Sequence, residues 1–104
     1  MIELTKRAKI ATGASRVVDW EQYGGSTGVF VDVDTSAAGF TKTPTYITSL
    51  HGMGAHWRTT GGSAVYNATP RGFRIYIQFE GREQLTTEIA KRHGWHIQWI
   101  GIED

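Results

Sequence analysis

The sequence predicts an all-β protein, a six-stranded antiparallel β-sandwich that forms a single domain over residues 1–104. Three stretches of its second half alternate apolar with polar residues, namely TPTYITSLHG, SAVYNATPRGFRIYIQFE and GWHIQWIGIED. A period of two residues is typical of half-buried strands. Glycine-rich or polar breaks separate these stretches, as connections between antiparallel strands require. With 104 residues, of which 39% are hydrophobic, the chain can build one core.

The first predicted strand is a short edge strand at residues 6–12 (KRAKIAT), which Gly13 and Ser15 would end. Residues 16–23 alternate too little for a strand, so we interpret them as a packed connection. The following residues 23–28 (YGGSTG) are predicted to be a flexible loop, because glycine permits positive φ and a close approach of the backbone.

The next two predicted strands enclose a turn-rich connection. From residue 29 onward, valines at alternate positions point to one face of a strand, namely Val29, Val31 and Val33. Residues 35–43 form the connection, anchored by Phe40. Pro44 has no amide donor and is tolerated where the strand at 45–51 opens. The mixed pattern of that strand predicts that it is covered on both sides.

Three further strands are predicted at residues 63–68, 73–79 and 95–102. The turn Thr69-Pro70-Arg71-Gly72 joins the first two into a hairpin. The strand at 73–79 alternates most cleanly, with Phe73, Ile75, Ile77 and Phe79 facing inward. The last strand carries apolar residues on both faces, which predicts a second buried contact. Residues 81–93 space Leu85, Ile89 and Ala90 as in one helical turn, and an ordered loop fits equally well.

The composition argues against several classes of function. Eleven Lys and Arg against ten Asp and Glu give a net charge of +1, so we expect no binding to nucleic acid. The absence of cysteine excludes disulfides, zinc thiolates and thiol nucleophiles. No apolar run reaches the ~20 residues of a membrane span, and none follows the N-terminal basic residues as in a secretory signal. We therefore expect no membrane insertion, and a protein that is cytoplasmic or released by a non-classical route.

We expect no metal, no cofactor and no enzyme activity. The histidine pairs His51/His56 and His93/His96 lie five and three residues apart, whereas strand residues share a face at i and i+2. They could instead line a trimer axis and titrate near neutral pH. The serines lack the context of a nucleophile elbow. Glu80 and Glu83 have the residue type of a glycosidase acid/base pair, but charged loops are common in proteins. We therefore interpret them as part of a solvated ion pair.

The stretches GFTKTPTYITSL, YNATPRGFRIYI and WHIQWIGIED, within residues 16–104, resemble the H-type lectin domain of snail agglutinins and discoidin-like proteins. The resemblance implies a six-stranded sandwich that assembles as a homotrimer or hexamer. It also implies glycan partners, of the N-acetylgalactosamine or galactose type. The family binds such sugars in loops at one end of the sandwich, near the seams between subunits.

The resemblance places the sugar site in the loops at residues 23–28, 52–58 and 79–92. Aromatic faces pack under the C–H groups of sugars, and His, Arg and Glu bond to their hydroxyls. We therefore expect ligand contacts from Tyr23, Gly25, Ser26, His56, Trp57, Arg58, Glu80 and Arg82. Arg58 lies within two positions of the sugar-contacting arginine of the family. The acidic residue of the family's first loop is replaced by Gly25-Ser26-Thr27, and its aromatic–His pair by Phe79-Glu80.

Two alternatives stay open at this point. Trp57 could plug the end of the core instead of binding a ligand, because large aromatic residues are usually buried. The protein could also be the trimerising or receptor-binding tip of a larger fibre, such as a phage tail or appendage, with no sugar affinity of its own. A natural gene much longer than 104 residues would favour the fibre.

Overall fold

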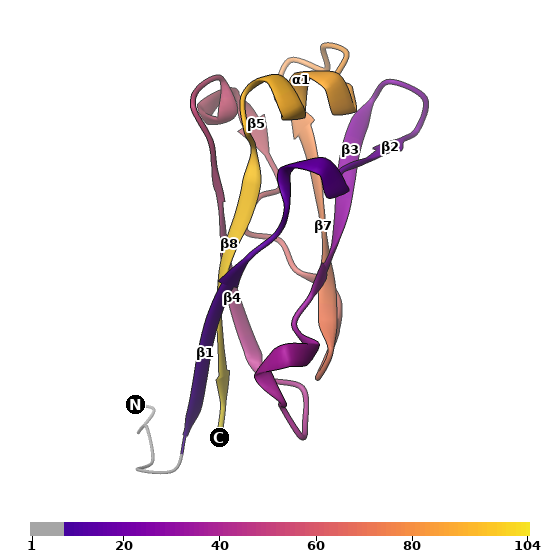
Figure 1. Ribbon diagram of the computed structural model, residues 1–104. Coiled ribbons are helices and arrows are strands. Elements are labelled where there is room, and N and C mark those ends of the chain that lie inside the picture. The colour runs from indigo at the N-terminus through magenta and orange to yellow at the C-terminus, as the bar shows by residue number, and fades with distance from the viewer. Residues whose placement is uncertain (1–7) are drawn as a thin grey trace.

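The computed structural model describes residues 8–104, which form two antiparallel sheets packed face to face (Figure 1). The first sheet has the order β1 (Lys9–Ala14), β8 (His96–Glu103) and β4 (Thr45–His51). The second sheet has the order β2 (Glu21–Tyr23), β3 (Gly28–Asp34), β7 (Gly72–Phe79) and β5 (Thr59–Thr60), and β6 (Tyr66–Thr69) also pairs with β7. The predicted all-β sandwich is confirmed.

The structure has eight strands in the described residues, where the sequence predicts six. The two additional strands are β2 and β5, which are only three and two residues long. Such short strands hold no detectable alternation, so they are found only through their pairing with β3 and β7. Short 3-10 helices precede β2, β4 and β5, namely η1 (Val17–Asp19), η2 (Ser36–Ala38) and η3 (His56–Arg58).

The core lies between the sheets and consists of the inward faces predicted from the alternation. Nearly all of its strand residues are buried, namely Val29, Val31, Val33, Tyr46, Phe73, Ile75, Ile77, Phe79, Ile97 and Trp99. Phe40 is buried as well, as expected for the anchor of its connection. Trp95 closes the upper end of the core, and its Nε1 donates a hydrogen bond of 2.8 Å to the carbonyl of Gly54.

Gly13 lies inside β1, so the prediction that it ends the strand is wrong. It is paired with Trp99 of β8, and a Cβ atom at Gly13 would lie 2.8 Å from the Trp99 ring. Glycine is therefore required by the indole above it. Ser15 also continues the contact, because its amide donates to the carbonyl of Ile97 at 2.8 Å. The predicted start of this strand, residues 6 and 7, lies outside the described residues.

The segment at residues 16–23 is more regular than the predicted packed connection, because it contains η1 and β2. The predicted loop at 23–28 is a hairpin turn between β2 and β3, in which the Thr27 hydroxyl donates to the Gly24 carbonyl at 2.8 Å. Gly24 and Gly25 have φ of 59° and 69°, the positive values for which glycine was expected.

The connections of the second half match the prediction in kind. The turn at 69–72 joins β6 to β7, with Thr69 paired to Gly72, although β6 begins at Tyr66 rather than at residue 63. The helical turn expected between 81 and 93 is α1 (Thr87–Arg92), whose first turn is capped by the Thr86 hydroxyl. In residues 8–104, no helix has the length and hydropathy needed to cross a membrane.

One part of the outward face of the first sheet is apolar and uncovered within the described chain, and the other part is polar, with Ser49 paired to Gln98 and His51 to His96. Ile47 of β4 is paired with Ile100 of β8, and Ile10 of β1 with Ile102 of β8. Ile10 and Ile47 are exposed, and the other two are half-buried. The sequence predicts that both faces of β4 and β8 are buried. Within one chain only the inward face is buried, by the core, and a partner would have to bury the outward face.

Candidate functional site

The three loops predicted to bind a ligand meet at one end of the sandwich, the upper end in Figure 1. We call residues 24–27, 52–58 and 80–93 the rim. Hydrogen bonds connect its parts: the amide of Leu85 donates to Ser26, that of Glu80 to Arg58, and that of Met53 to His93, at 2.8, 3.0 and 2.8 Å. Loops that are far apart in the sequence therefore form one continuous surface.

Trp57 projects from the rim into solvent. It lies in η3, and its side chain is 82% exposed. The alternative in which Trp57 plugs the core is wrong, because Trp95 occupies that place with no exposed surface. Ala55, which precedes η3, has a φ of 64°, and a left-handed conformation is costly for alanine. The chain thus accepts local strain to hold the segment that presents the indole.

Arg58 is held beside Trp57 by two contacts. Its guanidinium carbon lies 5.0 Å from the centroid of the Phe79 ring, and its Nη2 forms an ion pair with the Glu83 carboxylate. A stacked and paired guanidinium has few orientations left to lose when it binds a ligand. Both charged groups remain about half-exposed, so they offer donors and acceptors to a polar ligand.

His56 carries an unusual ring nitrogen. Its Nδ1 is buried and has no hydrogen-bond partner among the described residues. Most buried polar atoms are hydrogen-bonded, so an unpaired one calls for an explanation. The buried nitrogen faces the interior of the rim, whereas the neighbouring Trp57 side chain faces solvent.

The remaining predicted residues frame the rim. Gly25 lies at the open tip of the 24–27 turn, where an added Cβ atom would meet nothing within 4 Å. Ser26 contributes the carbonyl that accepts from Leu85. Glu80 and Arg82 are exposed, and Arg82 has a φ of 61° in the turn that follows Phe79. The rim thus holds two of the three non-glycine residues with positive φ in the described chain, which is typical of functional loops.

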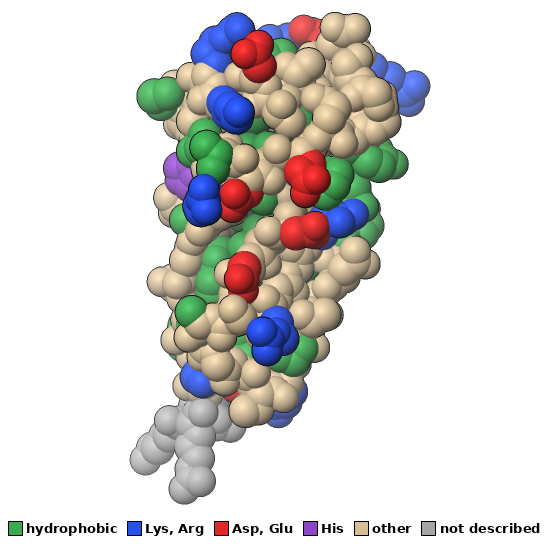
Figure 2. All heavy atoms as spheres, turned by 45° about the vertical axis from the view of Figure 1, so that its right-hand side comes forward, with side chains coloured by type: hydrophobic (Ala, Val, Ile, Leu, Met, Phe, Trp, Pro, Cys, Tyr) green, Lys and Arg blue, Asp and Glu red, His purple; other side chains and the backbone are tan. Residues whose placement is uncertain are grey.

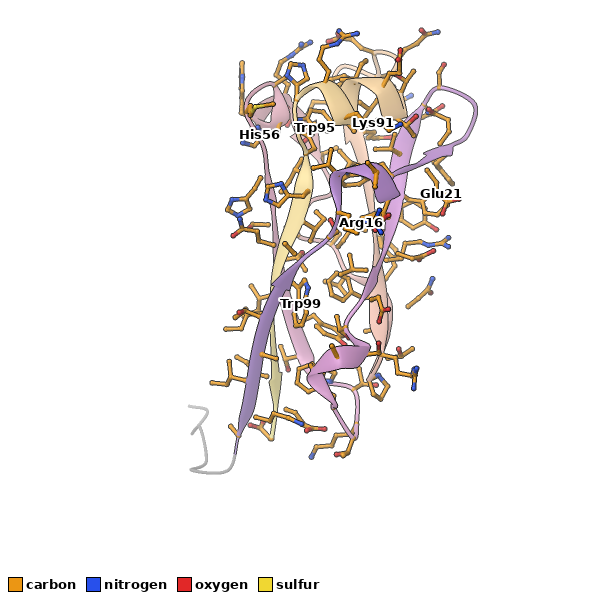
Figure 3. All side chains as sticks on the ribbon, viewed as in Figure 1. Arg16, Glu21, His56, Lys91, Trp95 and Trp99 are labelled. Atoms are coloured by element: carbon orange, nitrogen blue, oxygen red, sulfur yellow. The ribbon has the colours of Figure 1, made fainter. Side chains whose placement is uncertain are left out.

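Within one chain, the predicted residues form two groups rather than one pocket. One group consists of His56, Trp57, Arg58, Glu80 and Arg82, and Gly25 and Ser26 lie in the hairpin turn across the rim. Figure 3 shows His56 and Glu21 of β2 on opposite sides of the molecule. Tyr23 belongs to neither group, because its ring packs 5.1 Å from that of Tyr76 on the outward face of the second sheet.

The sequence does not predict the contacts that Glu83, Met53 and His93 make at the rim. Glu83 is expected in a solvated ion pair, and its partner is Arg58, 25 positions away. Met53 is exposed next to η3, and His93 stacks on Trp95 with the ring centroids 6.0 Å apart. No local sequence signal marks these contacts, since each depends on how two loops dock.

The carboxyl groups with shifted pKa values lie away from the rim. A hydrogen bond from Arg74 lowers the pKa of Asp32, and bonds from Ser36 lower that of Asp34. Bonds from Lys42 and Thr41 lower the pKa of Glu103. In residues 8–104, no three His, Asp or Glu side chains come together in a group that could hold a metal ion.

No protein-family model matches the chain, and no curated protein matches it. The resemblance to H-type lectins therefore stays a prediction.

Proposed function

We propose that the protein is a carbohydrate-binding module of the H-type lectin kind and that the rim binds the glycan. The observation that carries the proposal is the exposed Trp57 next to an Arg58 that Phe79 and Glu83 hold in place. A sugar ring has a C–H face and a hydroxyl edge. An indole packs on the first, and a guanidinium and carboxylate bond to the second.

Assembly into a trimer would multiply the site. The outward isoleucines of the first sheet form an apolar face of the kind that usually marks an interface. The 24–27 turn joins two strands of the second sheet, on the side away from this face, so each copy would carry its own rim site. Several equivalent sites on one rigid body also make weak contacts useful through avidity.

The test is the substitution Trp57→Ala, measured on a glycan array and then by calorimetry with the best ligand. We expect the affinity to fall at least about tenfold, because the C–H face of the sugar loses its aromatic partner. The melting temperature should stay nearly unchanged, since exposed positions contribute little to stability. Val18→Ala is the matched control, because Val18 is an exposed apolar residue of η1 outside the rim.

Two outcomes would contradict the proposal. Either the protein binds no glycan, or Trp57→Ala binds as tightly as the unsubstituted protein. A stable trimer that binds no glycan would instead favour the tip of a larger fibre.

A further inference from the structure

A second hollow, separate from the rim, lies on the outward face of the second sheet. Its walls carry Tyr23 of β2, Tyr66 of β6 and Tyr76 of β7, and it encloses about 550 Å³. We call it the tyrosine groove. In Figure 2, which brings this side of the molecule forward, hydrophobic side chains gather at the right-hand edge. The volume falls within the roughly 300–1,000 Å³ of small-molecule sites.

The strand register produces the groove. Tyr23 is paired with Gly28, Gly28 with Gln78, and Gln78 with Thr60, so these four residues form one row across the sheet. Gly28 has no side chain, which leaves a depression in the middle of the row. A Cβ atom there would lie 2.5 Å from the carbonyl oxygen of Ile77, so the depression is a requirement of the packing.

The aromatic walls support one another. The Tyr76 ring lies 5.1 Å from that of Tyr23 and 5.2 Å from that of Tyr66, and both contacts are edge-to-face. On the far wall, Gly61 has a φ of 109°, and a Cβ atom there would lie only 2.1 Å from the carbonyl oxygen of Tyr76. The loop is therefore pressed onto β7. Walls that are already ordered lose little side-chain entropy when a ligand binds.

The chemistry of the lining selects a neutral ligand. None of the lining residues is charged. The hydroxyls of Tyr23, Tyr66 and Thr60 make no hydrogen bond to another described residue, and neither does the side-chain amide of Gln78. Hydroxyl and amide groups both donate and accept, which matches the hydroxyls of a sugar, while the tyrosine rings match its C–H faces. The cation that adjoins the groove, Arg74, donates to the Tyr76 hydroxyl at 3.2 Å and is already paired with Asp32, so a phosphate or an acidic peptide would have to compete with that carboxylate.

We propose that the tyrosine groove is a second carbohydrate site, which binds a neutral oligosaccharide independently of the rim. The inference shares only its class of ligand with the proposed function. A proline-rich peptide could also pack on tyrosines. The carbonyls of such a peptide, however, only accept hydrogen bonds. The hydroxyl oxygens of the groove would then receive no hydrogen bond from the ligand, whereas a sugar would donate to them.

The test is a titration of the ¹⁵N-labelled protein, followed through its amide chemical shifts. The probes are maltohexaose, cellotetraose and lacto-N-tetraose, which are neutral and differ in linkage, each taken to about 10 mM because single sugar sites are weak. We expect at least one of them to shift the amides of Thr60, Gly61 and Gln78 in a saturable way. Tyr66→Ala should weaken this binding at least about fivefold. It should leave the fold intact, because Tyr66 is 51% exposed.

Trp57→Ala is the reciprocal control, an exposed aromatic residue of the rim replaced in the same way. It should leave the groove shifts unchanged, so that failure at the rim and failure at the groove are observed separately. The inference is overturned if no probe shifts the groove amides, or if Tyr66→Ala binds as the unsubstituted protein does. It is also overturned if decaproline shifts these amides and the sugars do not.

Discussion

Trp57 and Trp95 show how much of a residue's role depends on its surroundings. The side chains are identical, yet one is 82% exposed and the other fully buried. Trp95 follows a left-handed Gly94 at φ 61°, and the strand after it turns the indole into the core, where it meets Phe79 at a centroid distance of 5.9 Å. Trp57 follows the strained Ala55 turn, which directs it outward. The first tryptophan is a candidate for recognition and the second for stability.

Glu103 illustrates how one residue couples stability to pH. Its Oε2 accepts bonds from the Lys42 amide at 2.7 Å, and from the Thr41 hydroxyl and amide at 3.0 and 2.7 Å. The backbone bond from Lys42, followed by the bonds from Thr41, lowers its pKa below the usual value of 4.5. Its contribution to stability is therefore complete above about pH 4.5 and is lost as the pH falls through the lower pKa of the folded state.

We accordingly predict that Glu103→Gln is less stable than the unsubstituted protein at pH 7, and that the difference narrows as the pH falls below about 4.5. The amide cannot offer the charged oxygen that the amides of Thr41 and Lys42 bond to. Urea unfolding at a series of pH values measures the difference. A gap that is equally wide at pH 3 and pH 7 would show that the charge of Glu103 contributes nothing.

Among the elements, β1 depends most visibly on its neighbour. Gly13 leaves room for the Trp99 ring of β8, which is itself wedged against Tyr46 and Phe73 at centroid distances of 6.0 and 6.4 Å. An indole over a strand glycine pins the register of the pair, because the two must stay opposite each other. The position of the edge strand thus depends on Gly13, a residue at which the sequence pattern predicts the end of the strand.

The substitution Gly13→Ala should therefore destabilise the fold by about 1–3 kcal/mol, since the methyl group would overlap a ring that cannot shift freely. Gly81→Ala is the control, because the nearest atom to its new Cβ is an exposed Glu83 oxygen at 3.6 Å. It should change the free energy of unfolding by less than about 0.5 kcal/mol. Equal losses in the two variants would mean that the Trp99 contact is not tight.

At the scale of the whole molecule, the two sheets have different outward faces. That of the first sheet carries isoleucines, and that of the second carries tyrosines together with the Asp32–Arg74 ion pair. The first face suits a second copy of the chain, and the second suits a polar ligand. The rim lies at the end where both sheets finish, so assembly through the first face leaves the rim and the tyrosine groove accessible.

Light scattering coupled to size exclusion should therefore report a trimer. Ile47→Lys should convert it to a folded monomer, because Ile47 is 56% exposed in one chain and would place a charge in an apolar interface. Val18→Lys, at an equally exposed position outside this sheet, should remain a trimer. A monomeric unsubstituted protein would rule out the assembly and, with it, the gain from avidity.

The strands that carry the core could be predicted because alternation is a local signal. Val29 to Val33 and Phe73 to Phe79 bury every second residue, as their pattern indicates. The short strands β2 and β5 could not be predicted, because two or three residues acquire a strand conformation only from the neighbour that pairs with them. The same holds for Gly13, whose partner lies on the last strand.

By itself, the sequence determined the all-β class, the inward faces of the long strands and the three loops that form the rim, because each is encoded by neighbours a few positions apart. Only the tertiary structure decided which aromatic residues are exposed, that Arg58 pairs with Glu83, and that Tyr23, Tyr66 and Tyr76 line one groove. These relations join residues that are distant in the chain. They come into existence when the strands take their register and the two sheets pack.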